Sequence, residues 1–260
     1  MKKAVAMLAP SFVSEFSYPE IISKLHSLGF SRVVELTFGA KMINREYHKI
    51  LSSNNNLIIS STCPGIVSMV NQKYPEHVKN LARIDSPMIA TAKICKKIYP
   101  NLKTCFISPC NFKKQEASNS SYVDYCIDYQ ELREMLKKLK KKIKKNLQFD
   151  RFYNEYTRIY PVSGGLSKTA HLKGVLKKGE EKTIDGIQDV ERFLKRPSKI
   201  KFLDCTFCKG GCIGGPFISS RNISKNKRKV LDYLELAKRE NIPKFKAGLI
   251  EKAKGLKFSY

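Results

Sequence analysis

The stretch Cys205-Thr-Phe-Cys-Lys-Gly-Gly-Cys-Ile-Gly-Gly-Pro216 combines three thiols and four glycines within twelve residues. Glycine adds no side chain to a packed core and costs backbone entropy on folding. Glycines do let a backbone wrap closely around a bulky group, and thiolates are soft ligands that suit iron–sulfur clusters, zinc or copper(I). We therefore interpret this stretch as a metal-binding loop, in preference to a glycine-rich turn with chance cysteines.

Length and composition set the class of protein. The 260 residues are enough for one large or two small domains with an ample core. The N-terminus has no signal-peptide pattern, and no apolar run reaches the length of a membrane span. These features predict a cytoplasmic location, where the eight cysteines are reduced thiols or metal ligands rather than disulfides.

The formal net charge of +26 has two interpretations. Most basic residues are lysines, and Lys-, Asn- and Ile-rich usage can reflect codon bias in an AT-rich genome. A basic surface can also attract nucleic acid, an acidic membrane or an acidic protein. No zinc-finger, RRM or KH signature accompanies the charge, which disfavours nucleic acid as the partner.

The N-terminal third alternates short apolar runs with helical patterns. We expect strands at 3–8, 32–36 and 57–61, and helices at 18–28 and 41–51. This order predicts a parallel sheet with helices on its faces. Ligands of such sheets bind beyond the carboxyl ends of the strands. Cys63 lies at such a position, directly after the third predicted strand.

The remainder repeats this order of elements. We expect helices at 87–98, 131–145 (with Leu132, Leu136, Leu139 and Ile143 on one stripe), 163–170, 187–194 and 225–239, and strands at 103–107, 123–127 and 201–203. Residues 174–185 are expected to form a hairpin or loop, 149–160 receive no assignment, and the tail after Pro243 is expected to be loosely held. Together these patterns predict an α/β fold with two lobes of mainly parallel sheet and a metal cluster between them. We expect one domain over residues 1–260, with a C-terminal helix and basic tail at 218–260.

The cysteines fall into two groups. The first group consists of thiols in loops, and its members are Cys63, Cys110, Cys205, Cys208 and Cys212. A cubane cluster needs four thiolates, whereas structural zinc modules usually supply two closely spaced pairs. Only one part of this chain has short spacing, which favours iron–sulfur over zinc. The apolar surroundings of the other thiols predict packed core residues: Cys95, Cys105 and Cys126.

Four segments of the chain resemble, in order, the motifs of the FeFe-hydrogenase catalytic domain. They are 61–65 (Ser-Thr-Cys-Pro-Gly), 108–117 (Ser-Pro-Cys-Asn-Phe-Lys-Lys-Gln-Glu-Ala), 163–165 (Ser-Gly-Gly) and 208–215 (Cys-Lys-Gly-Gly-Cys-Ile-Gly-Gly). Shorter matches lie at 9–11, 38–40 and 86–87, so that the resemblance covers roughly residues 3 to 217.

The resemblance implies an H-cluster, which is a 4Fe-4S cubane joined through one cysteine to a di-iron unit with carbonyl, cyanide and bridging dithiolate ligands. It implies that the cubane is held by Cys63, Cys110, Cys208 and Cys212, the last of which bridges to the di-iron unit. Lys113 is then the donor to a cyanide, as a charge-assisted hydrogen bond favours. Further residues matched to the cofactor pocket are Pro10, Ser163 and Gly164, and Cys205 is left a structural role.

Three positions depart from the family pattern. Thr62 occupies the place of a cysteine that relays protons to the bridging amine, and a hydroxyl has a pKa far from that of a thiol. Ser108 and Thr206 replace methionines that flank the di-iron unit. Glu116 fits the pattern, so Thr62, Lys113 and Glu116 are the predicted catalytic residues, while the remote acidic relay residues have no match.

Two functions follow from the resemblance. The first is reversible reduction of protons to H2 with electrons from a ferredoxin-like donor, in a minimal form without accessory ferredoxin-like domains, assembled by hydrogenase maturation factors. The second is an H2 sensor or a non-catalytic hydrogenase-like protein with only a 4Fe-4S cluster. The three departures favour the second function, and the full set of ligands with Lys113 favours the first.

Overall fold

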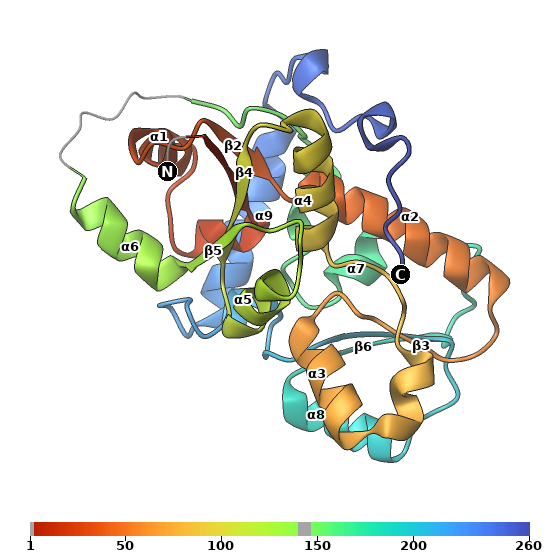
Figure 1. Ribbon diagram of the computed structural model, residues 1–260. Coiled ribbons are helices and arrows are strands. Elements are labelled where there is room, and N and C mark those ends of the chain that lie inside the picture. The colour runs from red at the N-terminus through yellow and green to blue at the C-terminus, as the bar shows by residue number, and fades with distance from the viewer. Residues whose placement is uncertain (1–2, 140–146) are drawn as a thin grey trace.

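The computed structural model describes residues 3–139 and 147–260 and contains two parallel sheets (Figure 1). The larger sheet has the order β2-β1-β4-β5. Its strands are β1 (Ala4–Leu8), β2 (Arg32–Glu35), β4 (Lys103–Ser108) and β5 (Tyr125–Asp128). Every residue of β1 is buried, as expected for a central strand of a parallel sheet that helices cover on both faces.

The smaller sheet has the order β3-β7-β6 and is also parallel. Its strands are β3 (Ile58–Ile59), β6 (Glu181–Asp185) and β7 (Phe202–Thr206). The central strand β7 pairs Phe202 with Ile58 on one side and with Glu181 on the other. The two-lobed α/β fold predicted from the sequence is therefore confirmed.

Helices cover both faces of the larger sheet, and alternate residues of β1 show which ones. Val5 and Met7 pack with helices α2 (Thr37–Ser53) and α4 (Pro87–Ile98). Ala4, Ala6 and Leu8 face the other way and pack with helices α1 (Glu20–Ser27), α6 (Tyr129–Lys137) and α9 (Ile223–Ala237). None of the described helices is both long enough and apolar enough to cross a membrane.

The smaller sheet lies between two further helices and α2. Leu203 of β7 packs in a cluster with residues of α3 (Pro64–Lys73) and α8 (Ile187–Lys195). Phe202 faces the opposite way and contacts the ring of Tyr47 from α2. The remaining helices are short: α5 (Asn111–Ser118), α7 (Gly165–Thr169) and the 3-10 turns η1 (Pro10–Ser14), η2 (Pro75–Asn80), η3 (Glu155–Ile159), η4 (Cys212–Gly214), η5 (Lys244–Lys246) and η6 (Ile250–Ala253).

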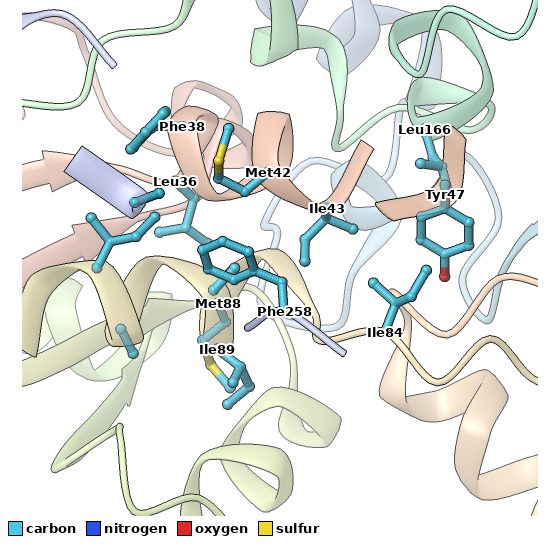
Figure 2. Close-up of a cluster of buried hydrophobic side chains, with 14 of the residues drawn as sticks. Leu36, Phe38, Met42, Ile43, Tyr47, Ile84, Met88, Ile89, Leu166 and Phe258 are labelled. Carbon is cyan, nitrogen blue, oxygen red and sulfur yellow. The ribbon is translucent and has the colours of Figure 1, made fainter. Parts of the chain in front are cut away.

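Helix α2 joins the two sheets into one core. Phe38 and Met42 of its N-terminal half belong to the same cluster of buried side chains as Met88 of α4 (Figure 2). Its C-terminal half presents Tyr47, which lies beside Leu166 at the other end of the cluster. Because one rigid helix spans both sheets, the carboxyl ends of their strands are held in a fixed relation.

Several predicted elements differ from the structure. The third predicted strand does not extend the first sheet, since β3 pairs with β7 of the smaller sheet. Residues 174–185 were expected to form a hairpin or loop, but 181–185 form the parallel strand β6. Helix α6 begins at Tyr129 and ends at Lys137, and residues 140–145 of the predicted helix, with Ile143, lie outside the described residues. The helices α3 and α5 were not predicted.

The C-terminal tail is packed rather than loosely held. Phe258 is buried and belongs to the cluster between α2 and α4 (Figure 2). Ser259 forms an isolated antiparallel bridge with Ile84, and the backbone N–H of Tyr260 donates to the carbonyl of Arg83. The prediction of a loose tail is wrong because the few apolar residues of the tail pack against a buried helix.

Candidate metal centre

Two of the predicted ligands lie at matching turns between a strand and a helix. Cys63 follows β3 and is the N-cap of α3, and Cys110 follows β4 and is the N-cap of α5. Pro64 sits in the first turn of α3, where its missing N–H and fixed φ suit a helix start. Both thiols therefore lie beyond the carboxyl end of a parallel strand, as the sequence predicted.

The other two ligands lie in the glycine-rich loop after β7. Gly211 has φ +82°, and a Cβ on it would come within 2.6 Å of the Pro161 carbonyl oxygen. The neighbouring N–H of Cys212 donates to that carbonyl over 2.8 Å. A Cβ on Gly214 would lie 2.0 Å from the carbonyl oxygen of Lys209. The loop thus needs glycine because its backbone packs against itself and against residues 161–163.

All four predicted ligands are close enough to influence one another. Burial raises the pKa of the Cys110, Cys208 and Cys212 thiols, that of Cys208 to about 12. The second contribution to these raised pKa values is mutual, because every pair among the four thiols, Cys63 included, repels when charged. Three segments that are far apart in sequence therefore bring four sulfur atoms to one place.

A cavity of about 90 Å³ lies beside these thiols, between the carboxyl ends of the two sheets. It is lined by the predicted residues Pro10, Thr62, Cys63, Cys110, Lys113 and Cys212. The rest of its wall is mainly apolar and includes Leu36, Ala40, Met88, Phe106, Val162 and Leu166. Six predicted site residues from four separate segments thus share one wall.

Lys113 is the one ammonium group in this lining. Its side chain is largely buried, with 11% exposed, and its Nζ donates to the Thr62 carbonyl oxygen over 3.3 Å. The same Nζ lies 2.6 Å from Oε2 of Glu116. This contact partly stabilises the ion pair of Lys113 and Glu116. The Lys113 ammonium also lies near the Cys212 sulfur, and its charge lowers the pKa of that thiol while burial raises it.

The remaining predicted residues lie outside the cavity wall. Glu116 lines an open pocket between α3, α4 and α5, on the far side of Lys113. Ser163 lines a different surface pocket, together with Lys209. Gly164 is the N-cap of α7 with φ +74°, and it is the next residue, Gly165, that lines the cavity. Cys208 contributes through its proximity to the other thiols.

The cysteines predicted to be structural are placed as expected in the main. Cys95 and Cys105 are fully buried in the two main apolar clusters. Cys205 is buried, and its backbone N–H donates a hydrogen bond to the Ser60 hydroxyl oxygen over 3.0 Å. Cys126 is only partly buried, on the edge strand β5.

The donor set fits a cubane better than a single metal ion. Among residues 3–139 and 147–260, no three His, Cys, Asp or Glu side chains converge closely enough to hold one ion. A cubane offers four separate iron atoms, one to each thiolate, so its ligands stand further apart than those of a mononuclear site. Four mutually repelling thiols around a glycine-lined loop therefore match an iron–sulfur cluster.

Two polar residues of the cavity wall were not predicted from the sequence. Asp204 lies on β7 and is 3% exposed, and Tyr160 follows the turn η3. An acidic residue inside the apolar strand 202–205 was a signal that could have identified the first. Burial raises the pKa of Asp204 to about 6, against the weaker opposing effect of its hydrogen bonds from Ser167.

This raised pKa predicts that Asp204→Asn stabilises the fold at neutral pH. An acid whose pKa is about 6 when folded and about 3.9 when unfolded opposes folding above pH 6, and the penalty disappears as the pH falls toward 4. We expect the free energy of unfolding to rise by about 2 to 3 kcal/mol at pH 7.5 and to change little at pH 4. Urea unfolding of both proteins at the two pH values measures this; an equal effect at both would contradict it.

The sequence matches one protein family over most of its length. The family model described as the iron only hydrogenase large subunit, C-terminal domain, matches residues 2–216. A curated protein named Iron hydrogenase 1, from Clostridium pasteurianum, is 24% identical over an alignment 268 residues long, which covers 79% of this chain and 47% of that protein. The chain thus spans about half the length of this curated relative.

Solved structures share the fold. One, described as revealing stepwise FeFe-hydrogenase H-cluster assembly, superposes with a TM-score of 0.72 at 15% identity, covering 98% of this chain and 89% of the other. A variant FeFe-hydrogenase from Chlamydomonas reinhardtii gives 0.70 at 15% identity, covering 95% and 86%. At such identities the structures establish the common fold.

Proposed function

The chain belongs to the family of the iron only hydrogenase large subunit, C-terminal domain, and from this premise we propose that it catalyses the reversible reduction of protons to H2. The observation that carries the proposal is the convergence of four cysteines, three of which line one cavity together with a buried lysine. A packing role would not require four buried thiols whose thiolate forms repel one another in one place, since buried polar and charged groups oppose folding unless they are compensated.

In this proposal the cubane is held by Cys63, Cys110, Cys208 and Cys212, and a di-iron unit with carbonyl, cyanide and dithiolate ligands lies in the adjoining cavity. When bound, the cluster supplies electrons and an iron site for the chemistry of H2. Lys113 supplies a buried ammonium that can bind an anionic ligand of this unit by a charge-assisted hydrogen bond. Pro10, Ser163 and Gly164 are proposed to shape the pocket, although Ser163 and Gly164 lie behind Gly165 in its wall.

The apolar lining has a function of its own in this scheme. Leu36, Met88 and Phe106 leave few polar partners for bulk water inside the cavity. In such surroundings the charge of Lys113 acts more strongly on a neighbouring anion than it would in water. Thr62 and Glu116 are the groups proposed to handle protons on this side, Thr62 from within the cavity and Glu116 from the open pocket beyond Lys113.

The proposed electron donor is a ferredoxin-like protein. The net charge of +26 suits an acidic partner, whose encounter would be steered by complementary charge. Lys209 lies directly after the proposed ligand Cys208 and is exposed, and Arg192 of α8 is exposed nearby in the same surface pocket. Maturation factors that deliver the di-iron unit complete the set of proposed partners.

Infrared spectroscopy after artificial maturation tests the function. We expect bands of iron-bound carbonyl and cyanide in protein first reconstituted with its cubane, together with H2 evolution from a reduced dye. Lys113→Ala should weaken retention of the di-iron unit, whereas Lys114→Ala, the next lysine in α5, should not. Lys114 is a matched control because it pairs with Asp128 and Glu131, away from the cavity.

The alternative is an H2 sensor or a protein with only a 4Fe-4S cluster. It is favoured by Thr62, and by Ser108 and Thr206 in place of the family methionines; of these, Thr62 and Thr206 line the cavity. Cubane iron and sulfide without carbonyl or cyanide bands would establish this alternative against ours. Bands without H2 turnover would indicate a sensor.

Thr62→Val is expected to lower the rate of H2 evolution. The substitution keeps the shape of the side chain and removes a hydroxyl that lines the cavity. Loss of a positioned proton-transfer group typically costs about 10²-fold or more. Thr62→Cys should raise the rate, since a thiol titrates nearer to the working pH than a hydroxyl does. Rates must be compared at equal di-iron content; parent-like turnover by Thr62→Val would show that protons reach the cavity by another route.

A further inference from the structure

A carboxyl group on β7 connects the cavity with a second pocket. Asp204 lines the inner cavity and is buried, with 3% of its surface exposed. Its Oδ2 accepts a hydrogen bond from the backbone N–H of Ser167 over 3.0 Å. The Ser167 hydroxyl lies beside the same carboxyl, although it makes no hydrogen bond of good geometry to any described residue.

Ser167 also lines a pocket on the surface of the protein. This pocket is open to solvent, and its other residues include Tyr156, Lys168, His171 and Glu181. One hydrogen-bonded pair of residues therefore separates this outer pocket from the inner cavity. The hydrogen bond between them is made by the Ser167 backbone N–H, and the Ser167 hydroxyl, which is buried without a partner among the described residues, must turn toward the carboxyl to pass a proton to it.

On the cavity side of Asp204, the Tyr160 hydroxyl can receive the proton. The Tyr160 hydroxyl is buried, lacks a hydrogen-bond partner among the described residues, and belongs to a side chain of the cavity wall. Burial raises its pKa, and the charge of Asp204 adds to that rise, which places the two groups near each other. Without the di-iron unit, the 90 Å³ of the cavity is also room for several water molecules, since one needs about 10 to 15 Å³.

We propose that Asp204 and Ser167 form a proton path between the outer pocket and the inner cavity. Asp204 takes up a proton from the Ser167 hydroxyl as water of the outer pocket reprotonates that hydroxyl. Asp204 then releases a proton to water in the cavity, or to the Tyr160 hydroxyl as this hydroxyl passes its own proton on, which regenerates the carboxylate; no electron moves. The path itself is a property of the fold, and its use in making H2 rests on the proposed function. It would supply protons from a side that the lysine and Thr62 do not serve.

The surroundings of Asp204 suit repeated protonation near neutral pH. Its pKa is raised to about 6, because burial and, to a smaller extent, the charge of Glu181 of β6 outweigh the opposing effects of Ser167 and Lys168. The other titratable groups that face it are Tyr47 of α2, Tyr160, and Cys205 of the same strand. A relay group works best when its pKa lies close to the working pH.

Infrared titration of the cubane-loaded protein tests the path without any turnover. We expect the C=O band of a protonated carboxyl to disappear with a midpoint near pH 6, and to be absent from Asp204→Asn, whose amide oxygen still accepts the Ser167 N–H. After transfer to D2O the band should shift at once in the parent and at least about tenfold more slowly in Ser167→Ala. The control Asp85→Asn removes another buried carboxyl, paired with Lys93, and should preserve both results.

Turnover then tests the use of the path. At equal di-iron content Asp204→Asn should evolve H2 at least about tenfold more slowly. Parent-like rates in Asp204→Asn would overturn the path and leave Asp204 only its contact with the Ser167 N–H at the start of α7. An unchanged rate of H/D exchange in Ser167→Ala would also overturn it. So would a carboxyl band that survives in Asp204→Asn. A parent protein with a complete di-iron unit and no H2 evolution would instead refute the proposed function, while the exchange rates still decide the path.

Discussion

Replacing Cys63, Cys110 or Cys208 by alanine is expected to abolish stable cubane binding. Each iron corner of the cluster takes one thiolate, and the loss of any one opens the cluster to solvent and leaves a site with three ligands. In anaerobically reconstituted protein we expect bound iron and acid-labile sulfide to fall to less than about half of the parent value, together with the visible absorption of the cluster.

The chain contains its own controls for this experiment. Cys95→Ala removes a thiol that is fully buried in the cluster between α2 and α4, so any effect on the cubane would have to be indirect. Cys126→Ala removes a partly buried thiol on the edge strand β5. Both variants should keep their full iron and sulfide content. Equal cluster loss from Cys126→Ala would overturn the assignment of the ligands.

Arg158→Leu is expected to destabilise the fold by about 3 to 5 kcal/mol. The guanidinium is completely buried, lies 2.9 Å from Oε2 of Glu240 and 3.4 Å from Oε2 of Glu35, and stacks over the Tyr233 ring at 4.0 Å. Glu35 is also fully buried and also accepts a hydrogen bond from the Tyr233 hydroxyl. Removing the arginine leaves two carboxylates without their cation, one of them in the core.

Urea unfolding of the metal-free and cubane-loaded proteins measures this loss. Lys137→Ala is a suitable control, because its ion pair with Glu134 is exposed and such pairs contribute about 1 kcal/mol at most. Burial raises the pKa of Glu35 against the opposing effect of Arg158, so part of the loss should be recovered at acid pH, where Glu35 is protonated. A loss below about 1 kcal/mol at pH 7 would contradict the assigned role of Arg158.

The sequence predicted most local elements because their signals are local. The helix at 87–98 coincides with α4, and the strand predicted at 103–107 differs from β4 by one residue. Apolar periodicity and terminal residues such as Ser86, whose side chain accepts from Ile89 N–H, determine these boundaries. Helices α3 and α5 were not predicted because their apolar spacing is weak and each starts at a cysteine that was assigned to a loop.

The candidate site divides in the same way. The sequence alone identified the four candidate cysteines, Lys113 and Thr62, through their places in motifs that resemble those of the family. The tertiary structure decided which strands share a sheet: β3 pairs with β7, about 140 residues away along the chain, because pairing depends on long-range burial that no local pattern encodes.

The tertiary structure also decided the environment of each polar group in the site. Asp204 and Tyr160 acquire their roles only when β7, η3 and α7 enclose one cavity. An aspartate next to a cysteine is an ordinary surface residue in most sequences, and its raised pKa here comes from desolvation by segments distant along the chain. The sequence therefore shows which residue types can bind a cluster. Burial exists only in the folded chain, and it sets how those residues and their neighbours exchange protons.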